Sequence, residues 1–149
     1  MKKATVIGLG RSGIAAAKLL TKHGYAVILS DSNHNPSLET QKQQLETTGI
    51  SVKLGDRFSP TNEDILVVSP GVPWDIAPLV RAREMGIDTI GEMELAWRYL
   101  QDIPWVAITG TNGKTTTTAL VDAIFQAAGL ETIGCGNIGF AACELALLE

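Results

Sequence analysis

Short runs of β-branched and aliphatic residues alternate with segments whose apolar residues recur at helical spacing, from the start of the chain to about residue 100. The pattern predicts strands at residues 4–8, 26–31, 50–54, 64–69 and 87–90, and helices at residues 13–22, 36–48, 77–85 and 92–100. Asn35 followed by Pro36 is typical of a helix start, and Gly49 and Gly86 are typical of helix ends. This alternation predicts an α/β fold with a doubly wound, Rossmann-like parallel sheet.

The rest of the chain repeats the pattern on a smaller scale. The sequence QDIP, at residues 101–104, is a predicted linker because Pro104 disfavours helix at the residue before it. Beyond it the pattern predicts a strand at residues 105–109, a helix at 114–128, a strand near Thr132 and a helix at 141–148. We therefore predict a first domain, residues 1–101, and an incomplete second domain, residues 102–149. Two strands make too small a sheet to be stable alone, so we expect the second segment to dock on the first domain or to be loosely ordered.

The composition predicts a folded protein without polyanionic partners. The chain has 149 residues, of which 45% are hydrophobic and 19% charged, and its net charge is -4 with scattered Lys and Arg. Neither nucleic acid nor an anionic membrane is an expected partner. Glycines interrupt the apolar N-terminal stretch, and no apolar run is long enough to span a bilayer, so we expect a cytoplasmic protein without membrane insertion. Cys135 and Cys143 lack metal-binding spacing and are expected to be buried free thiols.

A glycine-rich turn joins the first predicted strand to the first predicted helix. Gly8, Gly10 and Gly13 form the pattern G-x-G-x-x-G, in which Gly10 lets a phosphate approach the backbone and Gly13 lets the helix pack close to the strand. The unpaired N–H groups at the helix start favour a diphosphate. Asp31, at the end of the second strand, is placed to accept hydrogen bonds from a nucleoside. A tight turn that binds nothing is the alternative; the combination favours a nucleotide and leaves its identity open, NAD included.

A further turn, SPGVP, follows the fourth predicted strand. It places Ser69 and Gly71 at the carboxyl edge of the predicted sheet, where ligands of such folds bind, and Gly71 would admit a ligand close to the backbone. The alternative is that Pro-Gly forms a turn without a binding role.

A second glycine loop opens the predicted helix of the second segment. Gly113, Lys114 and Thr115 match the end of the P-loop pattern G-x-x-x-x-G-K-[ST], although Ile108 stands where the first glycine of the pattern belongs. Gly110 and Gly113 still permit a tight loop whose N–H groups wrap a triphosphate. Lys114 would reach the β and γ phosphates, and Thr115 would bind Mg²⁺. The alternative, a surface loop with a stray lysine, does not explain four consecutive threonines at a helix start.

Together these motifs resemble the amino-terminal part of the Mur ligase family. The resemblance runs through the whole chain in the order VIGLGRSGI, SPGVP, GEMEL, ITGTNGKTTTT and GNIG. TGTNGKT is the family's own form of the P-loop, so Ile108 is expected there. The best match is to the members that join D-glutamate to UDP-N-acetylmuramoyl-L-alanine in peptidoglycan synthesis. The resemblance implies that the second segment is the start of a P-loop ATPase domain, that the cofactors are ATP and Mg²⁺, and that the protein is a monomer.

The resemblance also implies a role for each glycine loop. The first would hold the uridine diphosphate of the substrate rather than NAD, through Gly8, Gly10, Arg11, Ser12, Gly13, Asp31, Ser32, Ser69, Gly71 and Asn137. Within this set, Gly10, Arg11 and Ser12 would contact the diphosphate and the uracil, and Asp31 and Ser32 the uridine. Gly71 would form the pocket wall, and Asn137 of GNIG would face the substrate. The second would bind ATP, with Lys114 and Thr115 catalytic and Thr115 the metal ligand, through Gly110, Thr111, Asn112, Gly113, Lys114, Thr115 and Thr116. In the family's reaction the γ-phosphoryl group of ATP passes to the L-alanyl carboxylate, and the amine of D-glutamate attacks the acyl phosphate.

The family extends well past residue 149, with the rest of the ATPase domain and a carboxyl-terminal domain that helps to bind ATP and the incoming amino acid. Its acid and histidine ligands lie in that part. Asp122 is an expected surface charge, and His23 and His34 are expected to be solvated or packing residues. We therefore expect this chain to bind uridine nucleotide weakly and not to catalyse. An NAD-binding domain of an oxidoreductase and a non-enzymatic nucleotide-binding module are the alternatives.

Overall fold

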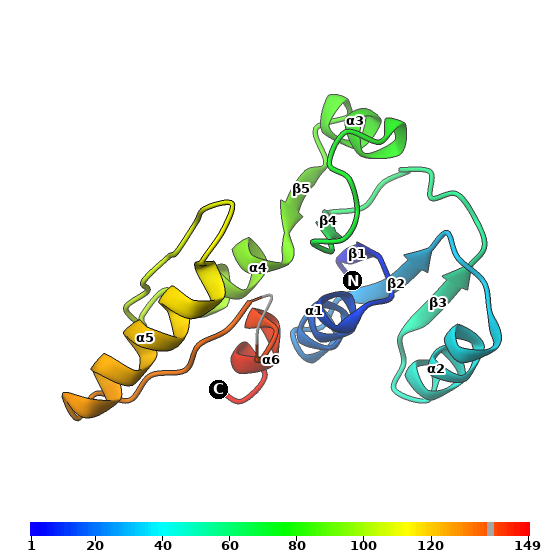
Figure 1. Ribbon diagram of the computed structural model, residues 1–149. Coiled ribbons are helices and arrows are strands. Elements are labelled where there is room, and N and C mark those ends of the chain that lie inside the picture. The colour runs from blue at the N-terminus through cyan, green and yellow to red at the C-terminus, as the bar shows by residue number, and fades with distance from the viewer. Residues whose placement is uncertain (137–138) are drawn as a thin grey trace.

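The computed structural model describes residues 1–136 and 139–149, and its centre is a five-stranded parallel sheet (Figure 1). The strands follow the order β3-β2-β1-β4-β5 and are β1 (Lys3–Ile7), β2 (Ala26–Asp31), β3 (Ser51–Leu54), β4 (Ile65–Val68) and β5 (Asp88–Gly91). The helices are α1 (Arg11–Lys22), α2 (Pro36–Glu46), α3 (Ala77–Glu84), α4 (Glu92–Tyr99), α5 (Lys114–Ala127) and α6 (Ala142–Ala146). The strand order reverses between β1 and β4, which is the Rossmann-like arrangement that the sequence predicted.

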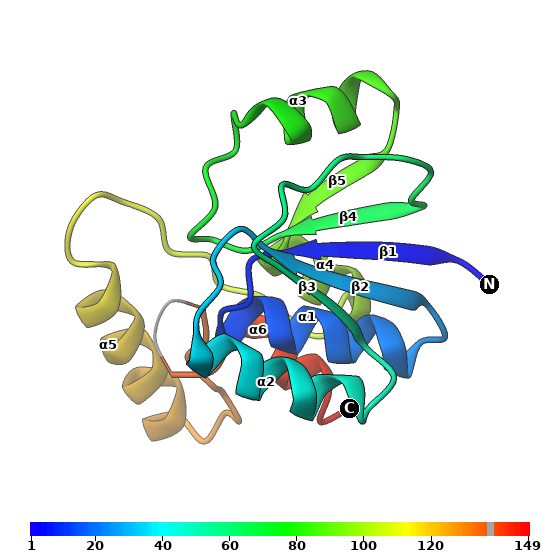
Figure 2. The same cartoon turned by 90° about the vertical axis from the view of Figure 1, so that its right-hand side faces the viewer.

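Helices cover both faces of the sheet, but unequally. All four residues of β4 are buried, because alternate side chains point to opposite faces of the sheet and both faces are covered there. Ile65 and Val67 join a large core with α1 and α4, whereas Leu66 and Val68 join a smaller core with α3. Figure 2 shows α3 on one side of the sheet and α1, α2 and α4 on the other. On the side of the sheet that carries α3, loops rather than a helix therefore cover β1 and β2.

Local sequence signals account for where the helices begin and end. The Asn35 side chain accepts the N–H of Leu38 at 3.0 Å and caps α2, with Pro36 as the first helical residue. Gly86 follows α3 with a φ of +76°, a conformation that favours glycine. α1 begins at Arg11, two residues earlier than predicted, because the chain turns into helix directly after Gly10. The alternating pattern thus predicted every strand and helix of the first segment, with small errors at the ends.

The two strands that the sequence predicted in the second segment are absent from the described residues. Residues 105–109 and the stretch around Thr132 have no ladder partner, and the one pairing nearby is an isolated bridge between Cys135 and Phe140. An apolar run forms a strand only beside another strand that satisfies its backbone groups, and no described segment supplies one here. That part of the prediction was wrong, whereas the helix at α5 is confirmed.

α6 docks on the first segment. It packs against α1 and α4 and buries Ala142, Cys143 and Ala146. The buried carboxylate of Glu92, at the start of α4, accepts the N–H of Cys143 at 2.7 Å and so satisfies a donor in the first turn of α6. The C-terminal helix is therefore part of the main core rather than an appendage.

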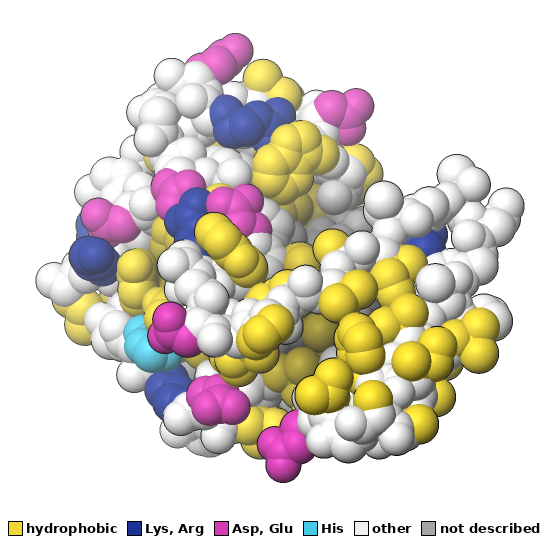
Figure 3. Space-filling model, turned by 90° about the vertical axis from the view of Figure 1, so that its left-hand side faces the viewer, with side chains coloured by type: hydrophobic (Ala, Val, Ile, Leu, Met, Phe, Trp, Pro, Cys, Tyr) yellow, Lys and Arg dark blue, Asp and Glu magenta, His cyan; other side chains and the backbone are white. Residues whose placement is uncertain are grey.

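α5 packs differently, because none of its residues is buried. Its apolar side chains Leu120 and Ile124 are 60% and 62% exposed, and Leu130 and Ile133, which follow the helix, are similarly open. Figure 3 shows hydrophobic side chains gathered over this part of the molecule. Within the described residues, no helix has both the length and the apolar character needed to cross a membrane.

Candidate functional site

A cleft of about 890 Å³ opens at the carboxyl edge of the sheet, at the point where the strand order reverses. Open parallel sheets bind ligands at this position. Its walls come from the segments that follow β1, β2, β3 and β4, and from two residues of the second segment, Gly136 and Ala141. Of the predicted substrate residues it brings together Gly8, Gly10, Arg11, Ser12, Asp31, Ser32, Ser69 and Gly71. Asn137 lies outside the described residues, and Gly13 lies behind the cleft.

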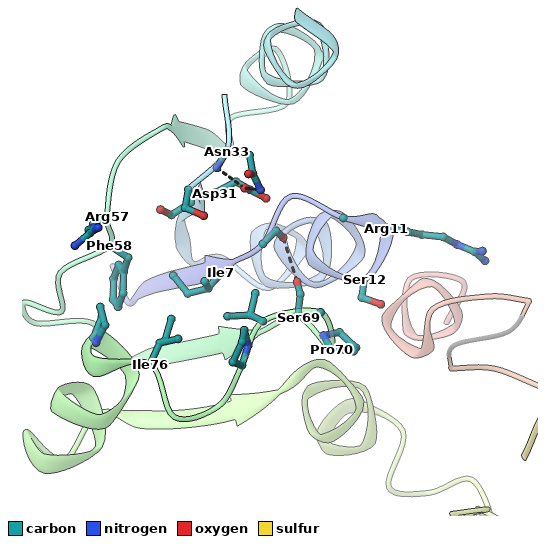
Figure 4. A pocket seen from close by; sticks show the side chains of 18 of the residues that line it. Ile7, Arg11, Ser12, Asp31, Asn33, Arg57, Phe58, Ser69, Pro70 and Ile76 are labelled. Carbon is teal, nitrogen blue, oxygen red and sulfur yellow. Dashed lines mark hydrogen bonds between the residues drawn. The ribbon is translucent and has the colours of Figure 1, made fainter. Parts of the chain in front are cut away.

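The first glycine loop is shaped by close backbone contacts. Gly8 has a φ of +98° and donates its N–H to the carbonyl of Ser30 at 2.8 Å. The buried hydroxyl of Ser69 donates to the Gly8 carbonyl at 3.1 Å (Figure 4). A Cβ added to Gly13 would lie 1.9 Å from the same carbonyl oxygen. Gly8 and Gly13 therefore let α1 approach β1, and Ser69 fixes the floor of the loop.

Gly10 is the residue that leaves room for a ligand. It is the N-cap of α1, and a Cβ added there would meet nothing within 4 Å. No side chain of the described residues caps α1, and the first turn carries no acidic residue. The first N–H groups of this helix and its partial positive charge therefore face the cleft, where they favour an anion.

Asp31 holds the glycine loop in place as well as lining the cleft. One carboxylate oxygen accepts the N–H of Leu9 at 2.8 Å, and the other accepts the backbone and side-chain N–H groups of Asn33 at 2.8 and 3.0 Å. The carboxylate thus ties the loop after β1 to the end of β2. Sequence reasoning assigned Asp31 to a nucleoside and carried no signal for this scaffolding role.

Arg11 lines the cleft, but its guanidinium turns away from the other labelled residues towards α6 (Figure 4). Its Nη2 donates to Oε2 of Glu144 at 3.0 Å, and its Nε lies 3.1 Å from the same oxygen. The predicted contact of Arg11 with a diphosphate stays a prediction, and in this structure the side chain is paired with a carboxylate.

Sequence reasoning missed the residues that form the far wall of the cleft. Arg57 and Phe58 lie in the loop after β3, and Ile76 lies just before α3. Phe58 and Ile76 pack against the smaller core, so they give this wall an apolar surface. The signal that would have found Arg57 and Phe58 is their place after the carboxyl end of a parallel strand, the same rule that pointed to Ser69.

The second glycine loop is open to solvent. Gly110 and Gly113 have φ values of +149° and +77°, and Gly113 is the N-cap of α5. Lys114 Nζ donates to the carbonyl of Gly110, which closes the loop on itself. The predicted nucleotide residues Gly110, Thr111, Asn112, Gly113, Lys114, Thr115 and Thr116 are all exposed in this loop and the first turn of α5. No side chain of the described residues caps α5, so its first N–H groups are available to a phosphate.

The donor set around this loop suits Mg²⁺ held mainly by a nucleotide. No three His, Cys, Asp or Glu side chains in residues 1–136 and 139–149 cluster closely enough to bind a metal ion. Mg²⁺ is commonly held by one or two protein ligands together with phosphates and water, and the exposed hydroxyl of Thr115 fits that pattern. Asp122 is not the plain surface charge that the sequence predicted, because it is half-buried and lines a smaller cavity with Thr115.

The cysteines and histidines of the chain contribute to packing and pairing within the fold. Cys135 and Cys143 are free thiols; Cys143 is buried as predicted, whereas Cys135 is only partly buried. Burial, reinforced by the charge of Glu92, raises the pKa of both above its ordinary value, and Cys143 lies deeper in the core. The His23 ring stacks on Tyr99 with centroids 4.1 Å apart, and His34 pairs with Glu39 at 2.8 Å. None of these groups lines the cleft.

The two loops lie on the same side of the molecule. Figure 2 shows α5 beyond the carboxyl ends of the strands, the edge at which the cleft opens. A phosphate held at the start of α5 and an anion held at the start of α1 would therefore occupy one end of the fold.

Both segments of the chain match known protein families. Residues 2–91 match the model of the Mur ligase MurD-like N-terminal domain, and residues 108–144 match that of the Mur ligase middle domain. A protein of Gloeothece citriformis named UDP-N-acetylmuramoylalanine–D-glutamate ligase is 63% identical over 152 residues, which cover 100% of this chain and 34% of that protein. A protein of Nostoc with the same name is 61% identical over 151 residues, covering 100% of this chain and 33% of that protein. The chain spans about a third of the length of these curated relatives.

Solved structures show the same fold. The UDP-N-acetylmuramate-alanine ligase MurC of Thermotoga maritima is 24% identical with a TM-score of 0.56, over 87% of this chain and 30% of that one. A murein peptide ligase of Psychrobacter arcticus is 26% identical with a TM-score of 0.55, over 87% of this chain and 27% of that one. On the strength of the two domain matches and the close relatives, the chain belongs to the Mur ligase family.

Proposed function

We propose that this chain is the amino-terminal part of a ligase that joins D-glutamate to UDP-N-acetylmuramoyl-L-alanine with ATP as the energy source. The names of the relatives at 61% and 63% identity support this pair of substrates. The observation that carries the proposal is the cleft at the carboxyl edge, which is lined by the uncapped start of α1 and, on its far side, by an apolar wall. A diphosphate matches the first feature, and a nucleobase matches the second.

Within the cleft, each group has a proposed task. The N–H groups around Gly10 and the side chain of Ser12 bind the diphosphate, while Phe58 and Ile76 form the wall against which the base lies. Ser32, exposed at the rim beside Asp31, is placed for the uridine. Asp31 keeps the hydrogen bond that it accepts from the N–H of Leu9 and holds the loop in its binding shape.

The second loop has the complementary task in this proposal. ATP supplies the phosphoryl group that activates the L-alanyl carboxylate towards the amine of D-glutamate. Lys114 and the first N–H groups of α5 bind the phosphates, and Thr115 is the proposed Mg²⁺ ligand. Positioning and charge stabilisation do the catalytic work, because phosphoryl transfer needs no protein nucleophile.

The domain division proposed from the sequence, residues 1–101 and residues 102–149, belongs to the same hypothesis. The exposed apolar face of α5 supports a second segment that is part of a larger ATP-binding domain. We expect these 149 residues to bind the UDP substrate and to release no phosphate from ATP in a D-glutamate-dependent way. The monomeric state and the lack of a nucleic-acid partner stay predictions.

A calorimetric titration of the chain tests the proposal. UDP-N-acetylmuramoyl-L-alanine, UDP and NADH are titrated in parallel under the same conditions. Heat from the two uridine ligands, with none from NADH, is the expected result. Binding of NADH alone would overturn the assignment of the cleft and restore the oxidoreductase alternative.

A further inference from the structure

The carboxylate of Glu144 joins the start of α1 to the start of α6. It accepts the Nη2 of Arg11 at 3.0 Å and the Nε of Arg11 at 3.1 Å, both on Oε2. The same oxygen accepts the N–H of Ala141 at 2.8 Å, at the start of α6. Arg11 is the first residue of α1 and lines the cleft, and so does Ala141. One side chain of the second segment therefore holds a cation that lines the cleft at the start of α1.

The pairing of Arg11 with Glu144 is weak enough to be displaced. The Arg11 side chain is 56% exposed and that of Glu144 is 32% exposed, and ion pairs in such solvated positions contribute little to stability. A diphosphate at the start of α1 would offer several anionic oxygens to the same guanidinium, in the bidentate geometry that arginine favours. The N–H groups around Gly10 would hold those oxygens at the same time.

We propose that Glu144 is a positioning residue that competes with the phosphates of a nucleoside diphosphate for Arg11. With the cleft free, Glu144 keeps the guanidinium turned towards α6; with a diphosphate bound, Arg11 turns to the ligand. Glu144 thus lowers the affinity of the cleft, and the ligand in return weakens one of the contacts that hold α6, because such coupling is reciprocal. The inference rests on the proposed function, since it takes the diphosphate site as given.

A double-mutant cycle tests the competition. UDP is titrated into the wild-type chain, Glu144→Gln, Arg11→Ala and the double variant at low ionic strength. Gln keeps an oxygen for the N–H of Ala141 but removes the charge that attracts Arg11. We expect Glu144→Gln to bind UDP roughly two- to five-fold more tightly than wild type, the range that an exposed ion pair supports. We expect Arg11→Ala to bind more weakly, and Glu144→Gln to add nothing in that background.

A merely structural role of Glu144 would give a different result. Loss of a contact in α6 would weaken binding or leave it unchanged, and would do so with or without Arg11. Glu46→Gln is the matched control, because it removes the same charge at an exposed position. Glu46 ends α2, which leads into the start of β3, so it lies away from the carboxyl edge at which the cleft opens. The gain in Glu144→Gln should also shrink as salt is added, because the pair it removes is exposed.

The outcomes separate this inference from the proposed function. The competition is refuted, and the uridine site stands, if wild type binds UDP and Glu144→Gln binds it no more tightly. The same conclusion follows if Glu144→Gln raises UDP affinity as much in the Arg11→Ala background as in wild type. An equal gain in Glu46→Gln would reduce the effect to net charge and also refute it. If none of the four proteins binds UDP, the site itself is wrong, and the inference is lost with it.

Discussion

Gly10 and Gly13 belong to one motif but meet different surroundings. A Cβ at Gly13 would overlap the carbonyl oxygen of Gly8 at 1.9 Å, and backbone cannot move aside as a flexible side chain can. We expect Gly13→Ala to lower the free energy of unfolding by about 2 kcal/mol or more, measured by urea denaturation. Gly10→Ala is the control: its Cβ meets nothing within 4 Å, so stability should stay within about 1 kcal/mol while UDP affinity falls. Equal stability of the two variants would contradict this account.

Asp31 was predicted to bind a nucleoside, and the structure gives it a role in stability as well. Removing its carboxylate leaves the N–H of Leu9 and that of Asn33 without their partner. We expect Asp31→Ala to lower the free energy of unfolding by about 1–3 kcal/mol in the absence of any nucleotide. Ser32→Ala, at the neighbouring exposed position, should leave stability unchanged. If Asp31→Ala were as stable as wild type and only bound UDP more weakly, Asp31 would have a binding role alone and the scaffolding role would be refuted.

The buried thiol of Cys143 predicts a pH dependence of stability. Burial and the neighbouring Glu92 raise its pKa, whereas the same thiol in the unfolded chain ionises near its ordinary pKa of about 8.5. Above that pH the unfolded state loses a proton that the folded state keeps, so the free energy of unfolding should fall as pH rises. Urea denaturation between about pH 7 and about pH 10 should show this fall in wild type and a smaller one in Cys143→Ala. Identical slopes would mean that Cys143 is accessible to solvent.

At the scale of elements, α1 and α5 differ in how deeply their apolar side chains are buried, and mutation can measure the difference in stability that follows. Leu20 of α1 is fully buried, whereas Leu120 of α5 is 60% exposed. We expect Leu20→Ala to lower the free energy of unfolding by about 2–5 kcal/mol, because it leaves a cavity in the core. Leu120→Ala should change it by less than about 0.5 kcal/mol. Denaturant unfolding of both variants checks this, and a large loss in Leu120→Ala would show that α5 is packed in solution.

The same contrast explains which elements could be predicted. β2 was predicted with its observed bounds, and the start of α2 was marked by Asn35 and Pro36, because these signals act locally. The apolar run at residues 105–109 carries the same local signal but has no neighbouring strand in the described structure. The hydrophobic pattern shows which side chains a segment can bury, but a strand also needs a neighbouring strand to satisfy its backbone groups, and the pattern does not show whether one is present. The docking of α6 through Glu92 and Cys143 joins residues 51 positions apart, and no local pattern announces it.

At the scale of the whole molecule, the two glycine loops should act as separable sites in this chain. Lys114 closes its own loop on Gly110 and does not line the cleft. We expect Lys114→Ala to leave the affinity for UDP unchanged and to remove whatever affinity for ATP the chain has. Parallel calorimetric titrations with UDP and ATP measure both, with Gly10→Ala as the reciprocal variant. Loss of UDP binding in Lys114→Ala would mean that the loops are coupled even without the rest of the ATP-binding domain.

The candidate site was predictable where a short motif or the end of a predicted strand marks its residues. Spacing within a few residues marks the glycine loop and the P-loop, and a place at the carboxyl end of a strand marks Asp31 and Ser69. Phe58 and Ile76 reach the cleft from separate loops and owe their place to the packing of α3. The partner of Arg11 lies 133 positions away, so only the folded chain reveals the pairing.

Gly136, Ala141 and the Arg11–Glu144 contact give the cleft a rim that belongs to the second segment. In a chimera that keeps residues 1–101 and takes the remainder from another family member, the rim of the cleft would change although the first segment had not been altered. If the cleft binds the proposed uridine ligand, we expect the affinity of such chimeras to depend on α6, a helix without a recognisable binding motif. The cleft of the first segment is therefore completed by residues in and around α6.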